Sequence, residues 1–346
     1  MTGATGFIGR ILLRHLAERG YETTVLVRDR GRLRADAEAV RVVEGDLRTG
    51  RGLDEAVKGV DRVLHLAGVI KTLRPGEYAE VNTAGTGRLC AALAAAPSPP
   101  RLVYCSSLAA AGPSLPGRPR REDDPPAPVS AYGRSKLGGE RVLHRLADHL
   151  PGVVVRPPIV YGPGDREFLP VLAAAVRRGL VPTCGPGPHH YSVIHVDDLC
   201  RALLAAADAD VRVGPEGTTE GIFQVSDGFH YRLADLTAAV AAAVGCRPPR
   251  LLPVPVAVAT AVALGADLAG RARGTASIFS RDKVRELRHS TWTCATDRAA
   301  RELGFSPAVT LSAGLAEAAC AATRAGSSGS PQGTAHHRGV DPENGG

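Results

Sequence analysis

The sequence predicts an α/β fold: a doubly wound parallel sheet followed by a smaller C-terminal region. The first observation is that continuously apolar strands alternate with helices over residues 1–162. Such strands are typical of a parallel sheet that helices cover on both faces. The second is the opening MTGATGFIG, in which three glycines lead directly into an amphipathic helix. The third is that the alternation loosens after residue 163, where a second region is expected to begin.

The elements of the first region are predicted from the spacing of apolar residues. Helical spacing predicts a helix over 10–19, and Gly20 is typical of the residue that follows a helix. Apolar runs predict strands over 23–28, 39–46, 62–68, 101–107 and 152–162. Helices are predicted between them, over 52–58, 77–96 and 131–149. We therefore expect residues 1–162 to form one domain.

The second region, residues 163–324, is expected to be interleaved with the end of the sheet. Its predicted elements are helices over 167–178, 195–207 and 232–244 and a strand over 222–226. The run LLPVPVAVATAVALGA at 251–266 carries no charge and is slightly short for a membrane span. We expect a buried or substrate-facing helix there, and do not favour the alternative of peripheral membrane contact. The small and polar residues of 325–346 predict a disordered tail.

Composition argues against nucleic acid and metal ions as ligands. The net charge of +7 is dispersed, and the few aromatic residues, 4% of the chain, do not interleave the basic ones. An anionic small molecule therefore accounts for the basic residues better than nucleic acid does. The seven cysteines lack the spacing of metal ligands, so no metal site is predicted. Their odd number and the lack of a signal peptide predict reduced thiols and a cytoplasmic location.

The glycine turn predicts a dinucleotide site at the start of the first helix. Gly3 and Gly6 would let backbone amides approach a pyrophosphate, and the helix dipole favours an anion at that point. Gly9 would let the helix pack closely on the sheet. The expected cofactor contacts in this turn are Gly3, Gly6, Phe7, Ile8 and Gly9.

The spacing TGATGFIG resembles the short-chain dehydrogenase/reductase superfamily, specifically its extended branch, the NAD-dependent epimerase/dehydratase family. The resemblance implies a Rossmann-type fold and an NAD(P)-dependent oxidoreductase. In that family a first strand occupies the residues before Thr2, so we expect this strand to be missing and the sequence to begin at an internal start. The neighbouring strands would then leave backbone groups unpaired.

Arg28, at the end of the strand predicted over 23–28, bears on the choice of cofactor. NAD enzymes of this kind place an acidic residue there for the ribose 2′-hydroxyl, whereas a guanidinium suits a 2′-phosphate. Arg28 therefore favours NADP over NAD, and Asp29, one residue later, keeps NAD open. By resemblance, further cofactor contacts are expected in the segments EGDL and HLAG, at Asp46, Leu47, Leu66 and Ala67.

The segment SAYGRSK supplies a pair of residues suited to proton transfer. Tyr132 and Lys136 are four residues apart, which places both on one face of a helix. The ammonium would lower the pKa of the phenol toward working pH, so that Tyr132 exchanges a proton with a substrate oxygen while Lys136 also holds the cofactor ribose. The resemblance implies a serine at the end of the preceding strand; alignment on Gly112 selects Ser107, with Ser106 pointing the other way.

Three more segments extend the resemblance. VNTAGTGRL is similar to the family's helix with an asparagine near the active site, here Asn82. RPPIVYGPGD resembles the strand and loop in which Pro157 and Ile159 would border the nicotinamide. HVDD resembles a later motif, in which His195 and Asp197 are expected to organise a loop rather than to react.

The resemblance implies hydride transfer at a secondary alcohol or ketone. The C-terminal stretch 277–307 looks like the corresponding part of bacterial relatives of the 3β-hydroxysteroid dehydrogenases. Within the family, the chain most resembles these enzymes and the dihydroflavonol reductases. With the apolar run before this stretch, the resemblance favours a steroid- or terpenoid-like substrate. Dehydratases of this family carry an acid/base pair directly after the serine. Here Leu108 and Ala109 follow Ser107, so dehydratase chemistry is not expected.

Two alternatives remain. One is a nucleotide-sugar epimerase or reductase, in which Arg166, Arg177 and Arg178 would meet a diphosphate. The other is a non-catalytic NADP-binding protein, which the presence of both Tyr132 and Lys136 argues against. The helices at 77–96 and 131–149 resemble the pair that dimerises in this superfamily, so a homodimer is expected.

Overall fold

The computed structural model describes residues 1–33, 40–185, 187–275, 277 and 279–327. Its strands are β1 Thr23–Val27, β2 Val40–Glu44, β3 Arg62–His65, β4 Arg101–Cys105, β5 Gly152–Arg156, β6 Ile159–Tyr161, β7 Leu180–Cys184, β8 His190–Tyr191, β9 Val193–His195, β10 Ile222–Gln224, β11 Tyr231–Arg232, β12 Arg250–Val254 and β13 Thr291–Trp292. Its α-helices are α1 Phe7–Glu18, α2 Leu53–Ala56, α3 Gly76–Tyr78, α4 Thr86–Ala94, α5 Leu108–Ala111, α6 Ala131–Arg145, α7 Leu169–Arg177, α8 Val196–Asp208, α9 Leu233–Ala243, α10 Val256–Arg273, α11 Arg281–Leu287, α12 Asp297–Leu303 and α13 Leu311–Ser327.

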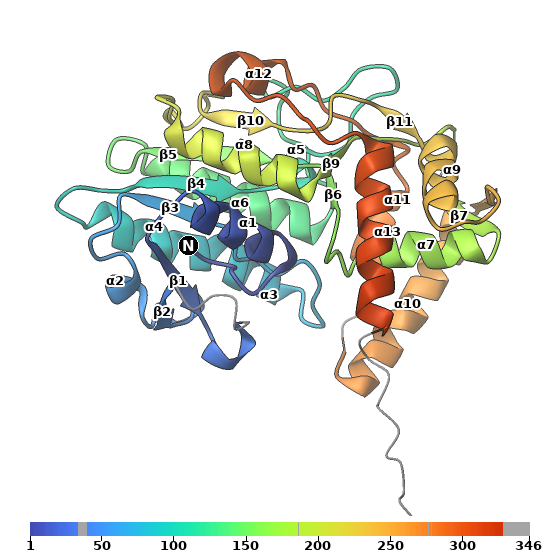
Figure 1. Ribbon diagram of the computed structural model, residues 1–346, viewed down its shortest axis with the longest axis horizontal. Helices are drawn as coiled ribbons and strands as arrows, with labels where there is room; N and C mark the ends of the chain where they lie inside the picture. Colours follow the sequence, from blue (N-terminus) through green and yellow to red (C-terminus); the bar gives the residue numbers. More distant parts are fainter. Residues whose placement is uncertain (34–39, 186, 276, 278, 328–346) are drawn as a thin grey trace, which may run out of the picture.

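A parallel sheet forms the centre of the N-terminal half (Figure 1). Four strands follow the order β10-β5-β4-β3, and β1 and β2 form a further parallel pair. Thr2 lies between these two groups, because it bridges both Leu26 in β1 and His65 in β3. The Thr2 N–H donates to the carbonyl of Leu64 (3.0 Å), and the Leu26 N–H donates to that of Met1 (3.0 Å). The α/β class with a parallel sheet is thus confirmed.

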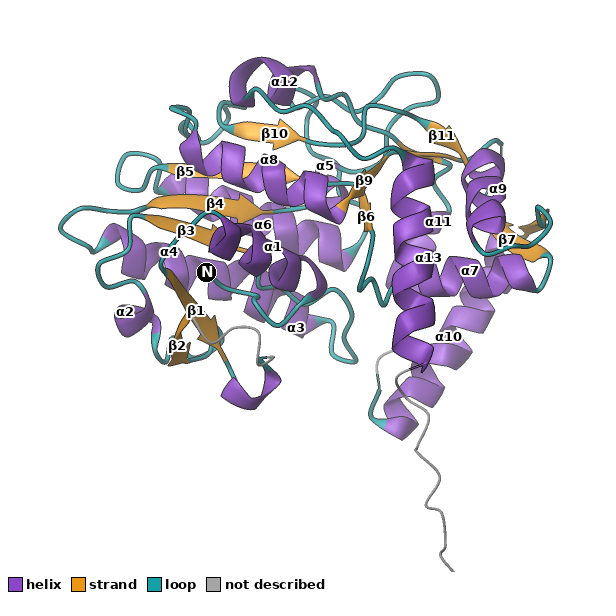
Figure 2. Ribbon diagram, in the orientation of Figure 1, coloured by secondary structure: helices purple, strands orange, loops and turns teal. Residues whose placement is uncertain are grey.

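Helices cover both faces of this sheet (Figure 2). Successive residues of a strand point to opposite faces, and in β4 both faces are buried. Leu102 and Tyr104 belong to the apolar cluster that α4 and α6 cover. Val103 and Cys105 belong to the cluster on the other face, beneath α1 and α8. This two-sided burial explains why the strands are continuously apolar.

The strand predicted over 152–162 is two strands. β5 ends at Arg156 and pairs with β4 and β10, whereas β6 begins at Ile159 and pairs with β9. Pro157 and Pro158 separate them, because proline has no N–H to donate to a sheet. The prediction of a single strand was wrong, and the break redirects the chain out of the sheet toward the C-terminal region.

The helix predicted over 77–96 is also interrupted. A short helix, α3, leads into a π-helical segment, η3 Ala79–Gly85, before α4 begins at Thr86. Asn82 and Gly85 are the buried residues of η3. Such π segments occur frequently at functional sites.

The C-terminal region packs around a separate apolar cluster. Residues of α7, α9 and α13 form it together with Tyr161 of β6 and Val193 of β9. Two small sheets, β11-β8-β13 and β12-β7, lie in this region. Among the described residues, no helix has the length and hydropathy needed to cross a membrane.

The prediction for residues 251–266 needs correction. The run begins as strand β12, which pairs with β7, and the helix α10 starts at Val256. This helix is not buried: Val258 and Val262 are 51% and 57% exposed, and only Ala259, Ala263 and Gly270 are buried.

The predicted tail also begins later than expected. α13 continues to Ser327, so residues 325–327 are helical. The remainder of the predicted tail, 328–346, lies outside the described residues.

Candidate active site

Two of the three glycines of the opening turn, Gly3 and Gly9, occupy positions where a side chain would collide. Gly3 has a φ of +77°, and a Cβ there would lie 2.7 Å from the amide nitrogen of Ala67. A Cβ on Gly9 would lie 2.1 Å from the carbonyl oxygen of Gly3. Gly6 precedes α1, whose first turn carries neither a side-chain cap nor an acidic residue. The backbone N–H groups at this end of α1 are therefore suited to an anion such as a pyrophosphate.

The end of β1 presents a cation to solvent. Arg28 follows β1 directly and is exposed. The carboxylate of Asp29 accepts a hydrogen bond from the N–H of Gly31 (2.9 Å) and so caps a short 3₁₀ turn, η1 Arg30–Arg32. Asp29 is thus engaged locally, whereas the Arg28 guanidinium faces outward.

The segment after β3 lies beside the glycine turn, and Leu47 in the segment after β2 lies against Gly85 of η3. Asp46 accepts a hydrogen bond from the N–H of Arg48 (2.8 Å), and Leu47 is buried. Leu66 and Ala67 contact the position where Gly3 would carry a Cβ. These segments from different parts of the sequence therefore meet at one edge of the sheet, as dinucleotide binding requires.

Asn82 connects this edge to α6. Its side-chain oxygen accepts a hydrogen bond from the N–H of Val69 (2.7 Å). Its amide nitrogen donates to the carbonyl of Val69 (2.9 Å) and to the hydroxyl of Ser135 (2.9 Å). Because every polar atom of this buried side chain has a partner within the protein, Asn82 positions the chain after β3; its contact with the cofactor stays a prediction.

The two serines at the end of β4 have different partners. Ser107 caps α5 by accepting a hydrogen bond from the N–H of Ala109 (3.1 Å), and its hydroxyl lies close enough to the Tyr132 phenol to lower the pKa of that phenol. The Ser106 hydroxyl donates to Glu140 (2.5 Å) and is buried. Ser107 is therefore the serine beside the phenol, and Ser106 faces the opposite way.

Tyr132 lies in the first turn of α6, and its protonation differs from the sequence prediction. Burial raises the pKa of Tyr132 above its usual range, and the nearby Ser107 hydroxyl lowers it by less. The expectation that the ammonium brings the phenol toward neutral pH therefore does not hold here, since burial outweighs it. Tyr132 is a neutral phenol at neutral pH.

Lys136 lies one turn further along α6 and is almost completely buried. Its ammonium donates to the carbonyl of Cys105 (2.7 Å) and lies 4.5 Å from the centre of the Tyr104 ring. Burial lowers the pKa of Lys136 to about 8. A Cβ on Gly68 would lie 3.7 Å from the ammonium, so Lys136 borders the same segment that the glycine turn contacts.

A buried ion pair links α6 to the end of β5. Arg156 donates to both carboxylate oxygens of Glu140, from Nε (2.9 Å) and from Nη2 (2.6 Å). Both side chains are almost fully buried. The sequence analysis did not identify this pair, although Glu140 lies four residues after Lys136 and so shares its helical face.

A carboxylate from the C-terminal region holds the start of α6. Asp282 accepts hydrogen bonds from the N–H groups of Ala131 (2.7 Å) and Tyr132 (3.2 Å). An anion is favourable at a helix N-terminus. The sequence carries no signal for this contact, because Asp282 is 150 residues away from Tyr132 along the chain.

Pro157 and Ile159 lie on either side of the break between β5 and β6. The carbonyl of Pro157 accepts a hydrogen bond from the N–H of Leu108 (2.8 Å), which ties the end of β5 to the start of α5. Ile159 packs at the margin of the C-terminal apolar cluster. Pro157 thus adjoins Ser107, whereas Ile159 faces the second region.

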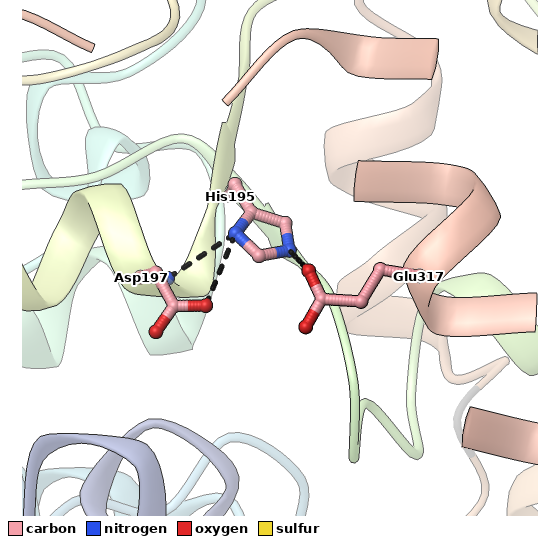
Figure 3. Close-up of side chains that lie close together, drawn as sticks. All are labelled: His195, Asp197 and Glu317. Atoms are coloured by element: carbon pink, nitrogen blue, oxygen red, sulfur yellow. Dashed lines mark hydrogen bonds and ion pairs between the residues drawn. The ribbon is translucent and has the colours of Figure 1, made fainter. Parts of the chain in front are cut away.

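His195 lies between two carboxylates, as Figure 3 shows. Its Nδ1 lies 3.5 Å from Asp197 and its Nε2 lies 3.7 Å from Glu317. One donor atom from each of the three side chains lies within 4.8 Å of the others, while the two ring nitrogens of His195 each face a different carboxylate. Burial lowers the pKa of His195 more than the two carboxylates raise it. We interpret the group as a link between α8 and α13.

A cavity of about 350 Å³ lies elsewhere, and Ser107, Tyr132 and Lys136 do not line it. Its lining residues are Gly117, Arg118, Pro119, Arg121, Gly228, His230, Cys294, Ala295, Thr296 and Asp297. The functional assignment therefore rests on the residues at the sheet edge, not on this cavity.

Comparison with known proteins agrees with this geometry. Residues 1–219 match the model of the NAD dependent epimerase/dehydratase family. The chain belongs to this family. It is 36% identical over 299 residues to "Ceramide reductase" from Caulobacter vibrioides, covering 85% of this chain and 84% of that protein. Members of the family among its relatives are reductases, dehydrogenases and epimerases, so the chain is an oxidoreductase of this family, as the resemblance implied.

Two further comparisons show how broad the family is. The chain is 29% identical to "2-alkyl-3-oxoalkanoate reductase" from Stenotrophomonas maltophilia, covering 91% of this chain and 96% of that protein. Among solved structures, "MoeE5 in complex with UDP-glucuronic acid and NAD" is 28% identical with a TM-score of 0.71, covering 94% of this chain and 98% of that one. Relatives with apolar and with sugar-nucleotide substrates thus share this fold.

Proposed function

We propose that the protein is an NADP-preferring reductase that converts the ketone of an apolar, lipid-like substrate to a secondary alcohol. The observation that carries the proposal is the proximity of the Ser107 hydroxyl to the Tyr132 phenol, with Lys136 one turn away on α6 and bordering the segment on which the glycine turn packs. Together these side chains would supply a proton donor, a second hydroxyl and a cation at the edge of the sheet where the family holds its cofactor.

The reaction follows from what these side chains can do. The reduced nicotinamide, when bound, supplies a hydride to the carbonyl carbon. The Ser107 hydroxyl polarises the substrate oxygen, and Tyr132 donates its phenolic proton to that oxygen as the C–H bond forms. Because burial keeps Tyr132 protonated, it is suited to act as the acid, which is the role that reduction needs. The Lys136 ammonium holds the cofactor ribose and favours the phenolate that remains.

The cofactor preference rests on Arg28. This guanidinium is exposed directly after β1, while Asp29 is engaged in capping its own turn. A ribose 2′-phosphate can therefore meet a cation without meeting a free carboxylate. The glycine turn and the uncapped first turn of α1 fit the pyrophosphate, and Leu66 and Ala67 lie beside the turn; Asp46 and Leu47 remain predicted cofactor contacts.

Calorimetry with NADP and NAD tests this preference. We expect Arg28→Ala to weaken NADP binding by about tenfold or more while leaving NAD binding nearly unchanged, since a charge-assisted contact to a phosphate is lost. Arg41→Ala, which removes an exposed arginine from β2, serves as the matched control. Equal losses for both cofactors, or tighter binding of NAD by the unaltered protein, would contradict the assignment.

The substrate class is supported by the names of the relatives. One is a ceramide reductase, one reduces 2-alkyl-3-oxoalkanoates, and a third, from Stigmatella aurantiaca and 28% identical, is a ketoreductase of a farnesyl-bearing quinoline oxide. All three names describe substrates with long apolar groups. The rival is a nucleotide-sugar epimerase, favoured by the 29% identity to "UDP-glucose 4-epimerase" from Vibrio cholerae. Turnover of UDP-glucose but not of long-chain ketones would favour this rival.

Replacing the acid tests the reaction itself. We expect Tyr132→Phe to lower the kcat for NADPH-dependent ketone reduction by about 100- to 10,000-fold, because the proton donor is lost. Cofactor affinity should stay nearly intact. Tyr21→Phe, which alters an exposed tyrosine, should behave as the unaltered protein. Activity retained in Tyr132→Phe would overturn the mechanism.

A further inference from the structure

Strand β12 and helix α10 present an apolar surface to solvent. Val258, Val262 and Leu268 of α10 are 51%, 57% and 56% exposed. The other large apolar residues exposed on these two elements are Leu251, Leu252, Val256 and Leu264. We call these seven residues the α10 face. Contiguous exposed apolar residues of this kind mark interaction sites in soluble proteins.

Apolar residues occupy almost the whole circumference of α10, not one stripe. The side that contacts the protein carries Ala259, Ala263 and Gly270. The outward side carries valine, leucine, alanine and glycine, with Thr260 as its polar residue between 256 and 266. A helix that is apolar all round is normally covered on all sides. Within the described residues, nothing covers this outer side, which Figure 1 shows at the periphery of the C-terminal region.

Exposed arginines lie at both ends of the α10 face. Arg250 precedes it at the start of β12, and Arg271 and Arg273 follow it in the last turn of α10; all three are exposed. The sequence of α10 contains one acidic residue, Asp267, and its carboxylate is engaged by Arg281 (3.3 Å). An apolar surface with arginines at both ends is complementary to a bilayer that exposes anionic headgroups.

The α10 face also ends beside the candidate active site. The Asp267–Arg281 contact joins α10 to α11, and Asp282, the next residue of α11, binds the N–H groups at the start of the catalytic helix α6. The Gly270 end of α10 lies next to Leu73, in the segment between β3 and α3. The C-terminal end of α10 is therefore joined, through α11, to the start of the helix that carries Tyr132.

We propose that the α10 face docks the protein peripherally on an anionic lipid bilayer. The valines and leucines enter the acyl boundary and the three arginines meet the headgroups. Docking through α10 brings α11, which packs against α10 and holds the start of α6, close to the bilayer. If an apolar ketone is the substrate, it then reaches the site without crossing water. Only this route of the substrate rests on the proposed function.

Sedimentation with lipid vesicles tests the docking without substrate or cofactor. The full chain should bind vesicles of phosphatidylcholine and phosphatidylglycerol about tenfold more tightly than vesicles of phosphatidylcholine alone, and salt should weaken the binding. Val258→Glu/Val262→Glu, which places two carboxylates on the exposed side, should lower the affinity by about tenfold or more. Leu115→Glu, at a residue 61% exposed outside the face, is the matched control and should bind as the unaltered protein.

The outcomes separate the explanations. Arg271→Glu/Arg273→Glu should reduce binding to anionic vesicles selectively. Reduction of a short, water-soluble ketone should be unchanged in Val258→Glu/Val262→Glu, whereas reduction of a vesicle-embedded ketone should fall. Vesicle binding that is absent, or equal in all variants, overturns the proposal. A dimer in solution that only Val258→Glu/Val262→Glu dissociates would also overturn it, since a second copy would then cover the face. Vesicle binding without ketone reduction would refute the proposed function alone.

Discussion

Lys136 is a cation that the fold removes from water and holds against a backbone carbonyl. The hydrogen bond to Cys105 and the Tyr104 ring compensate only part of the lost hydration, so burial lowers the pKa of Lys136 to about 8, from an ordinary value of 10.5. A shift of this size corresponds to about 3 kcal/mol of destabilisation when the lysine is charged. Burial of the charged Lys136 near the candidate active site therefore lowers the stability of the folded protein.

The lowered pKa of Lys136 predicts that the free energy of unfolding depends on pH. The unfolded chain keeps the Lys136 proton up to its ordinary pKa, whereas the folded chain releases it near pH 8. The free energy of unfolding should therefore rise by about 2 kcal/mol between about pH 7.5 and about pH 9.5, relative to Lys136→Met. Denaturant unfolding of both proteins at the two pH values measures the difference. Lys58→Met, at an exposed lysine, should follow the unaltered protein, and a constant difference across pH would contradict the burial argument.

Most of the site residues singled out from the sequence meet at one edge of the sheet. The glycines, Ser107, Tyr132 and Lys136 could be selected because motif spacing reflects local geometry: a turn, a strand end and one helical face. Their roles stay predictions. The protonation state of Tyr132 could not be predicted this way, since its pKa depends on burial by segments distant in sequence.

At the scale of elements, α6 is held from both regions of the chain. Ser130 caps it locally by accepting from the Gly133 N–H (2.9 Å), a pattern visible in the sequence. Asp282 of α11 caps it from the C-terminal region. The position of Tyr132 in the first turn therefore depends on how the two regions pack.

Neutralising this contact tests the dependence. Asp282→Asn keeps one oxygen acceptor but loses the charge and the second acceptor, so we expect a loss of about 1–2 kcal/mol in stability. Displacement of Tyr132 should also lower kcat by about tenfold with little change in cofactor affinity. Asp235→Asn, in the first turn of α9, is the control. An unchanged kcat in Asp282→Asn would show that α11 does not position Tyr132. Unfolding curves and steady-state kinetics measure the two effects.

Three predicted elements differ from the structure for identifiable reasons. The pair Pro157–Pro158 ended β5, although the apolar run continues through it. The helix over 77–96 contains a π segment at Asn82, whose side chain bonds Val69 and Ser135 far away in sequence. The run 251–266 was expected to be buried on grounds of hydropathy alone. The hydrophobic pattern of a sequence indicates which residues are apolar, but it does not indicate which other segments pack on them.

At the scale of the whole molecule, the family and the parallel α/β fold were determined by the sequence itself. Alternating apolar strands and helices, a glycine turn and the Tyr132–Lys136 spacing are local patterns, each imposed by short-range geometry. The homodimer through 77–96 and 131–149 and the cytoplasmic location stay predictions. Only the tertiary structure decided that Glu140 pairs with Arg156 and that Asp282 holds α6. It also decided that the outer side of α10 meets solvent. These features depend on contacts between segments far apart in the chain, and a single sequence does not specify such contacts until the layers are packed.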